Sequence, residues 1–184
     1  MRSPTARAAG LLAAVLVCTT SLATRAYAQE PKSATGAREL AQLMQAKKLD
    51  SIAARRPSGD DQFVAALHFP GQLLVVWARY AAPALLNEKI TKGQYRDAYI
   101  DLNSAAVPST KVLINDLGAD GLRPRRENNQ PFDQQDAGGK GISFDGNWRE
   151  DKMSEQDYMK IYSAADQGYA EALEALIAQL KKPN

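Results

Sequence analysis

QFVAALHFPGQLLVVWARY, residues 62–80, is the stretch that decides the fold. Residues 62–69 alternate as a strand does, with one side carrying Phe63, Ala65, Leu67 and Phe69 and the other carrying Val64, Ala66 and His68. Pro70 and Gly71 supply the fixed φ and the positive φ that a type II turn requires. Residues 73–80 are apolar on both sides, which is typical of a central strand. The stretch therefore predicts an antiparallel hairpin inside a larger sheet.

Helices are predicted on either side of this hairpin. Residues from Ala37 place Leu40, Leu43 and Met44 on one helical face, with Thr35 as the expected N-cap. A second helix is expected from Pro83, which suits the first helical turn, to about Gly93. The strongest helical period is the last, where apolar residues recur at three- and four-residue steps from Tyr158 to Leu180. Ser154 and Asp157 form a capping-box pattern before it, and we expect this helix to pack across the sheet.

Further strands are predicted from short apolar runs between turn residues. They are expected at 50–54, ended by the turn 57–60, and at 142–148, where Asp145 and Gly146 form a turn. Residues 95–102 fit either an extension of the second helix or another strand. We prefer a strand at 98–102 that pairs through the turn 107–109 with a strand at 111–117. The chain is thus expected to form a single α+β domain over residues 37–184. Its antiparallel sheet, or small barrel, has about five strands, an N-terminal helix and a long C-terminal helix.

The first 28 residues have the pattern of a signal peptide. Arg2 and Arg7 precede an apolar run at 8–17, and the small residues Ala26 and Ala28 flank Tyr27 before Gln29. The run is about ten residues, against the roughly 20 that a membrane-spanning helix needs, so stable insertion is not expected after cleavage. The sequence predicts a periplasmic or secreted protein that begins at Gln29.

Cleavage changes the charge and the cysteine content. The segment 1–28 holds three arginines, no acid and the single cysteine, Cys18, so 20 basic and 21 acidic residues remain. A mature charge of −1 does not favour nucleic acid as a partner. A chain without cysteine has neither disulfides nor thiolate metal ligands. The core is expected to hold the fold together unaided.

Two segments have little apolar content. Residues 29–36 are small and polar, and we expect a flexible leader there. Residues 122–141 are rich in Arg, Asn, Gln, Asp and Gly, and such a segment repays little of its ordering entropy by burial. We therefore expect a mobile loop at 122–141, whose arginines Arg123, Arg125 and Arg126 are a candidate contact surface.

Catalytic and metal motifs are weak. His68 is the only histidine, and a structural or surface role is favoured over catalysis in an envelope hydrolase. No Gly-x-Ser-x-Gly elbow is present, so no catalytic residue is assigned. Zinc would need more nitrogen and sulfur ligands than the chain has, and acids between Asp116 and Asp136 do not follow the spacing of an EF-hand. We assign no metal site.

Arginines beside predicted strands suggest a ligand site. Arg55 and Arg56 follow the strand at 50–54, and Arg79 and Tyr80 end the hairpin. Guanidinium groups at the end of a sheet bind phosphate or carboxylate groups well, although solvated surface charge is the ordinary alternative. Aromatic side chains nearby can line a pocket for a flat ligand or simply pack in the core.

The layout resembles that of one known family. The order of a helix, a strand after Leu49, the hairpin through Pro70 and Gly71, a helix from Pro83 and a hairpin through Pro108 is similar to the pyridoxamine-phosphate-oxidase-like split β-barrels. The likeness spans about residues 38–122 and includes no diagnostic phosphate-binding motif. It implies a flavin-type cofactor and redox activity, but no site residue is carried over from the family. The strand-end residues Arg55, Arg56, Arg79 and Tyr80 are the candidates to lie near such a ligand.

Two functions follow from these patterns. The first is an exported binding or interaction protein without a recognisable catalytic motif, whose protein or small-molecule partner is unknown. The second is a split-barrel protein that binds a flavin- or haem-type cofactor. The sequence does not name the cofactor, and it leans against an enzyme.

Overall fold

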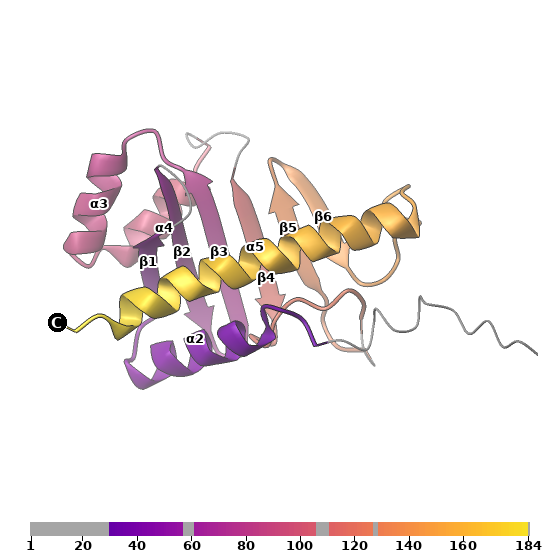
Figure 1. The fold of residues 1–184 in the computed structure, drawn as a ribbon, viewed down its shortest axis with the longest axis horizontal. Helices are drawn as coiled ribbons and strands as arrows, with labels where there is room; N and C mark the ends of the chain where they lie inside the picture. Colours follow the sequence, from indigo (N-terminus) through magenta and orange to yellow (C-terminus); the bar gives the residue numbers. More distant parts are fainter. Residues whose placement is uncertain (1–29, 57–60, 106–110, 127–128, 184) are drawn as a thin grey trace, which may run out of the picture.

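The computed structural model describes residues 30–56, 61–105, 111–126 and 129–183. It is a single α+β domain with an antiparallel six-stranded sheet and helices on both sides (Figure 1). The elements follow the order α2 (Ala34–Ala46), β1 (Ser51–Arg55), β2 (Gln62–Phe69), β3 (Gln72–Arg79), α3 (Pro83–Thr91), α4 (Tyr95–Asn103), β4 (Val112–Leu117), β5 (Asp133–Ala137), β6 (Lys140–Phe144) and α5 (Glu155–Lys181).

The strands lie in the sheet in their chain order, from β1 at one edge to β6 at the other. The predicted hairpin is confirmed as β2 and β3, with Phe63 opposite Ala78 and Phe69 opposite Gln72. Gly71 has φ +74°, the left-handed conformation that the turn after Pro70 requires. β3 pairs with β4, which makes it a central strand. Each strand therefore pairs with its neighbours in the chain, and the β2–β3 hairpin lies inside the sheet.

The two faces of the sheet build two separate cores. The front face, which carries Val64 and Ala66, packs under α2 and α5. The rear face, which carries Phe63 and Ala65, packs under α3 and α4. The alternation predicted for 62–69 is therefore confirmed over 63–67, where successive side chains enter different cores, whereas Phe69 is exposed.

The helix α5 crosses the whole front face, as predicted (Figure 1). Its inward residues run from Tyr158 to Ile177 at helical spacing, and Tyr158, Tyr169 and Leu173 are almost fully buried. Ser154 is the N-cap, and its Oγ accepts a hydrogen bond from the Asp157 N–H at 3.1 Å. Ser154 Oγ also donates to Asp157 Oδ2 at 2.7 Å, so the pattern works as a local cap that is a shorter form of the capping box.

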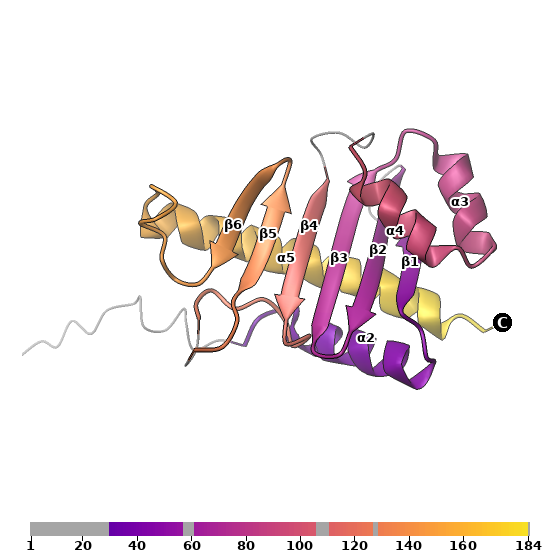
Figure 2. The ribbon, with the colours of Figure 1, turned by 180° about the vertical axis from the view of Figure 1, so that it is seen from behind.

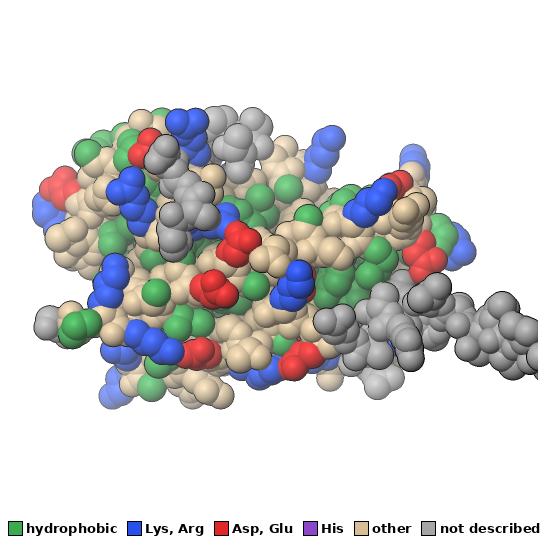
Figure 3. Space-filling model, viewed as in Figure 1, with side chains coloured by type: hydrophobic (Ala, Val, Ile, Leu, Met, Phe, Trp, Pro, Cys, Tyr) green, Lys and Arg blue, Asp and Glu red, His purple; other side chains and the backbone are tan. Residues whose placement is uncertain are grey.

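The rear helices cover only part of their face. Both α3 and α4 contact β1, and α4 continues over β2 and β3. Figure 2 shows that no described helix covers the rear of β4, β5 and β6. We call β1–β3 the covered half of the sheet and β4–β6 the open half. The surface over the front helix carries acidic and basic side chains intermixed, without a large patch of one sign (Figure 3).

The predicted strand at 98–102 is wrong, because these residues belong to α4. Ala98, Tyr99 and Leu102 are its buried residues, and they repeat at helical steps. Tyr and Ile favour strands only weakly, and burial against the rear core decides the conformation. The turn at 107–109 lies outside the described residues.

The segment predicted as a mobile loop, 122–141, contains a strand and the start of another. Asp133–Ala137 forms β5, which pairs with β4 on one side and with β6 on the other. Leu122 is fully buried, and Asp133 is 3% exposed. The backbone of this polar segment is satisfied by the sheet, which a count of apolar residues does not reveal.

The flexible leader predicted at 29–36 is also wrong within the described residues. Helix α2 begins at Ala34 rather than near Ala37, and Ser33 replaces Thr35 at the N-cap position. Ser33 and Ala34 are both buried, and the Ser33 N–H donates a hydrogen bond to Asp166 of α5. The predicted signal peptide, 1–28, and the turn at 57–60 lie outside the described residues. Among the described helices, none has the length and apolar content needed to span a membrane.

Candidate functional site

Two of the four residues predicted to hold a cofactor, Arg55 and Arg56, lie on opposite faces of the sheet. Arg55 faces the rear, where it is exposed, lies 3.9 Å from Asp61 and sits 6.0 Å from the ring centroid of Phe63. Arg56 is buried on the front, with Nη2 2.6 Å from Glu171 Oε2 and its guanidinium 5.5 Å from the Trp77 ring. Both guanidiniums therefore stabilise the end of the sheet through partners within the chain.

The other two residues of that set are separated in the same way. Arg79 is exposed at the end of β3, opposite Gln62. The Tyr80 hydroxyl donates to Asp101 Oδ2 at 3.2 Å, and Lys89 binds the same carboxylate oxygen. Burial and the Asp101 charge raise the pKa of Tyr80. This trio links β3 to α3 and α4, so its first role is to attach the rear helices.

The loop arginines are also engaged within the chain. Arg123 binds Asp120, and Arg126 Nε donates to the Gln130 carbonyl at 2.8 Å. Arg125 packs so closely that a Cβ on Gly146 would lie 3.0 Å from its Cβ. Arg125 and Arg126 are exposed, whereas Arg123 is half-buried. The structure thus brings these arginines near one another along an ordered segment.

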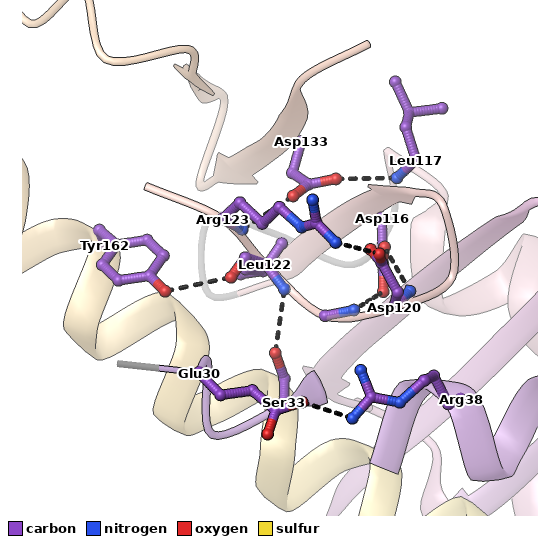
Figure 4. A network of polar contacts seen from close by, with 11 residues as sticks. Glu30, Ser33, Arg38, Asp116, Leu117, Asp120, Leu122, Arg123, Asp133 and Tyr162 are labelled. Carbon is purple, nitrogen blue, oxygen red and sulfur yellow. Dashed lines mark hydrogen bonds and ion pairs between the residues drawn. The ribbon is translucent and has the colours of Figure 1, made fainter. Parts of the chain in front are cut away.

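A buried polar network is the most elaborate feature that the sequence did not reveal (Figure 4). The Asp116 carboxylate is fully buried and accepts the N–H groups of Asp120 at 3.2 Å and Gly121 at 2.9 Å. It also accepts the Tyr169 hydroxyl at 3.0 Å. A carboxylate that receives three hydrogen bonds is well satisfied even without a cation.

Asp133 is the second buried carboxylate of the network. It accepts the Leu117 N–H at 2.9 Å and the Arg123 N–H at 2.9 Å, one on each oxygen. Burial and the neighbouring Asp116 charge raise the pKa of Asp133 to about 7, and burial also raises the pKa of Asp116. Asp116 and Asp133 together hold both ends of the turn after β4.

The N-terminal segment and α5 complete the network. Ser33 Oγ donates to Asp166 Oδ1 at 2.6 Å and accepts the Leu122 N–H at 3.0 Å. Tyr162 donates to the Leu122 carbonyl at 3.0 Å, and Tyr158 to the Pro124 carbonyl at 2.8 Å. A cavity of only about 10 Å³ remains beside Asp133, too small for a ligand. The network therefore has a structural role, which is to attach the segment after β4 to α2 and α5. We call it the latch, and its side chains are those of Ser33, Asp116, Asp133, Tyr158, Tyr162, Asp166 and Tyr169.

The sequence carries one signal of this latch. This signal is a set of polar side chains in segments where burial is expected, namely the acids at 116, 120 and 133 and the tyrosines at 158, 162 and 169. The acids suggested at most a hard cation. Within the described residues, no group of three or more His, Cys, Asp or Glu side chains is placed to hold a metal ion. Backbone N–H groups take the place of a cation.

Two open spaces lie elsewhere on the molecule. The first, of about 420 Å³, is a groove on the front face between α2 and the turn after β2, and Arg38, Gln42, Gln45 and His68 contribute its polar side chains. The second, of about 330 Å³, is a hollow on the rear of the open half. Both volumes lie within the range of small-ligand sites. Neither contains the residues predicted to bind a cofactor.

The rear hollow has an apolar floor and a polar rim. Leu74 and Leu113 form the floor beside α4's core, and Asn115, Gln134 and Asp136 lie around it. Gly141 of β6 borders the hollow, and a Cβ there would meet nothing within 4 Å. Among the described residues, Asp136 is the one charged side chain that lines this hollow. The surface of the hollow is therefore mostly apolar, with a single carboxylate at its rim.

The edge strand β6 lies next to this hollow. Its backbone pairs with β5, and no hydrogen bond from the described residues reaches its outer side. Lys140 and Gly141 are exposed, whereas Ser51–Ala54 of the opposite edge strand are buried. Phe144 of β6 packs edge to face on Tyr158 and Tyr162, with centroids 6.1 and 5.6 Å away. Figure 1 shows that the N-terminal end of α5 extends past β6, beyond the edge of the sheet.

Comparison with known proteins adds no assignment. No family model, no curated protein and no solved structure matches the chain. The resemblance to the split-barrel superfamily stays a prediction, and so does the flavin- or haem-type cofactor that it implies.

Proposed function

We propose that this chain is an exported interaction module that binds an extended segment of another protein along β6. The observation that carries the proposal is that no described residue pairs with the outer edge of β6 and no described helix covers the sheet face beside it. An edge strand presents N–H and C=O groups in a row, and an added strand satisfies them. The arginines of 122–126 contribute to a contact surface only at its border, because they are already bound within the chain.

The two sides of such an added strand would meet different surroundings. Side chains that point forward would reach the projecting start of α5, where Trp148, Met153 and Met159 are half-buried apolar residues. Side chains that point to the rear would lie beside Gly141 and the mostly apolar hollow. The fit is therefore to a segment that alternates apolar residues with small or uncharged polar ones.

Catalysis has less support than binding in this geometry. The lining of the front groove contains His68 but no Ser, Cys, Asp or Glu side chain, so a nucleophile and an orienting acid are not beside the imidazole. The described lining of the rear hollow contains Ser143 and the Asp136 carboxylate but no histidine, lysine or cysteine. Binding makes use of every feature described for the open half.

The edge can be tested with peptides selected from a random display library against the purified protein. We expect bound peptides to protect the amides of 140–144 from hydrogen exchange. Gly141→Lys fills the hollow and adds a charge to the edge, and it should weaken these peptides at least tenfold. Ala178→Lys, on the exposed side of α5, is the matched control and should bind normally.

Several outcomes would overturn the proposal. Peptides that protect another segment, or that bind Gly141→Lys as tightly as the wild type, would place the contact elsewhere. Self-association that protects 140–144 at rising protein concentration would make a second copy the occupant.

Export is tested separately, by the mass and location of the protein isolated from its own host. A chain that begins at Gln29 in the envelope or medium is expected. A chain that still carries residues 1–28 in the cytosol would contradict export, and it would leave the β6 contact untouched.

A further inference from the structure

The groove on the front face collects hydrogen-bond donors from three parts of the chain. Arg38, Gln42 and Gln45 lie at helical steps of four and three along one side of α2. His68 comes from β2, and Gly71 and Gly118 close the groove from the turns that follow β2 and β4. Ala41 is the small residue between the polar side chains, and it leaves the space open.

The charge of this groove favours an anion. Arg38 is its one formally charged lining residue. The nearby Asp120 carboxylate is directed to Arg123, as Figure 4 shows. A guanidinium fork with side-chain amides beside it is a donor set that matches the oxygens of a carboxylate.

The chain already supplies a carboxylate to this arginine. Glu30 Oε1 lies 2.5 Å from Arg38 Nη2, and both side chains are substantially exposed, at 64% and 46% (Figure 4). The Lys32 N–H donates to Asp166 at 2.8 Å and the Ser33 N–H at 3.1 Å, which anchors the chain two and three residues after Glu30. Glu30 is thus a tethered carboxylate that binds an arginine of the groove lining. An exposed ion pair of this kind is weak and easily exchanged.

We infer that this groove is a binding site for a small organic carboxylate, which replaces Glu30 on Arg38 and takes hydrogen bonds from Gln42, Gln45 and His68. The volume of about 420 Å³ accommodates a small acid with a short polar body. The site is independent of the β6 edge, because His68 and α2 lie on the front face whereas the hollow lies on the rear.

The test uses glutarate, which carries the carboxylate of a glutamate side chain, as the probe. Titration of the purified protein is followed by NMR at the side-chain amides of Gln42 and Gln45. We expect saturable shifts of these signals. Arg38→Gln should raise the Kd at least tenfold, because it removes a charge-assisted fork. Glu30→Gln should lower the Kd about two- to fivefold, because it removes an internal competitor worth what an exposed ion pair is worth.

The controls separate this site from general charge effects. Arg96→Gln removes another exposed arginine, which belongs to α4 and lies 3.8 Å from Asp50. This substitution should leave the Kd for glutarate unchanged. Unshifted Gln42 and Gln45 amides in both the wild type and Glu30→Gln would overturn the inference, even where Arg38→Gln folds poorly. Tighter binding of inorganic phosphate than of glutarate would overturn the carboxylate assignment.

Discussion

The covered half and the open half of the sheet solve the same problem with different chemistry. In β1–β3, apolar residues on both faces enter cores under helices, and Phe63, Val64, Ala65 and Ala66 are all fully buried. In β4–β6 the described helices cover only the front face, and buried carboxylates and tyrosines link the strands and their turns to α5. The difference shows that a polar latch can replace a second layer of helices.

The consequences for function follow from the same difference. A layer on both faces leaves the β1 edge little surface for a partner, since Ser51–Ala54 are buried. In the part of the chain that the structure describes, the open half exposes a largely apolar rear face and an edge strand that no other strand pairs with. Interaction sites lie preferentially where the scaffold leaves surface uncovered, provided that the strands remain rigid.

The largest effect is expected from a glycine of the latch compared with a glycine of the open edge. Gly121 has φ +95°, and a Cβ there would lie 2.5 Å from the Ala34 Cα. Gly121→Ala should therefore cost roughly 4 kcal/mol or more in the free energy of unfolding, or prevent folding. Gly141→Ala, which meets nothing within 4 Å, should stay within about 0.5 kcal/mol. Urea unfolding compares the two, and equal costs would contradict the role of the latch.

Truncation of one apolar residue in each half gives the next largest difference. Phe63 is fully buried under the rear helices, and Phe63→Ala should cost about 3–5 kcal/mol. Leu113 is half-buried on the open rear face, and Leu113→Ala should cost about 1 kcal/mol. A cost for Leu113→Ala as large as that for Phe63→Ala would mean that another part of the chain covers the rear of the open half.

The stability of the open half should depend on pH through Asp133. Its pKa is raised to about 7 in the folded state, from about 4 in an unfolded chain, so the folded state favours the protonated form. This contribution is fully present below the unfolded pKa and is lost as the pH rises through about 7. The wild type should therefore gain on the order of 2 kcal/mol, relative to Asp133→Asn, between pH 8 and pH 5.

Denaturant unfolding at several pH values measures this dependence. Asp50→Asn is the comparison variant, because Asp50 lies exposed next to the covered half. An Asp133→Asn variant that keeps the full pH dependence of the wild type would assign the effect to other groups.

The smallest effect is expected at the end of α5 that projects from the open half. Ser154→Ala removes the cap on the Asp157 N–H and should cost about 1 kcal/mol. Ser154→Asn should recover most of it, since Asn caps helices as well as Ser does. Hydrogen exchange should show faster opening in the first turn of α5 only. Faster exchange throughout α5 would contradict a local cap.

The sequence predicted the covered half better than the open half. The reason is that the secondary structure of the covered half is set by signals within a few residues. Alternation in 62–69 and the Pro70-Gly71 turn are local signals, and tertiary packing reinforces them. Pro83 and Ser154 likewise mark helix starts through their own backbone chemistry. These elements needed no knowledge of their neighbours.

The open half escaped prediction because its order comes from partners distant in sequence. The β5 sequence DQQDA has poor strand propensity, and it forms a strand since β4 and β6 flank it and two backbone N–H groups satisfy Asp133. Ser33 can be buried because Asp166, which is distant in the sequence, accepts the hydrogen bonds of its N–H and its hydroxyl. In 98–102 a helical repeat competed with strand-forming residues, and the rear core decided between them.

The candidate site residues show the same division. Sequence alone indicated that arginines end the strands, but strand order and face separate Arg55 from Arg56 and bind each to a partner. The groove around Arg38 and His68 joins a helix to a turn, and no spacing along the chain relates them.

By itself the sequence determined the α+β class, the central hairpin and the long capped helix, because each depends on contacts within a few residues. Only the tertiary structure decided which face of the sheet stays uncovered, where the acids are buried and which donors meet in a groove. Those features depend on the distances between residues far apart in the chain, and packing rather than local conformation sets such distances.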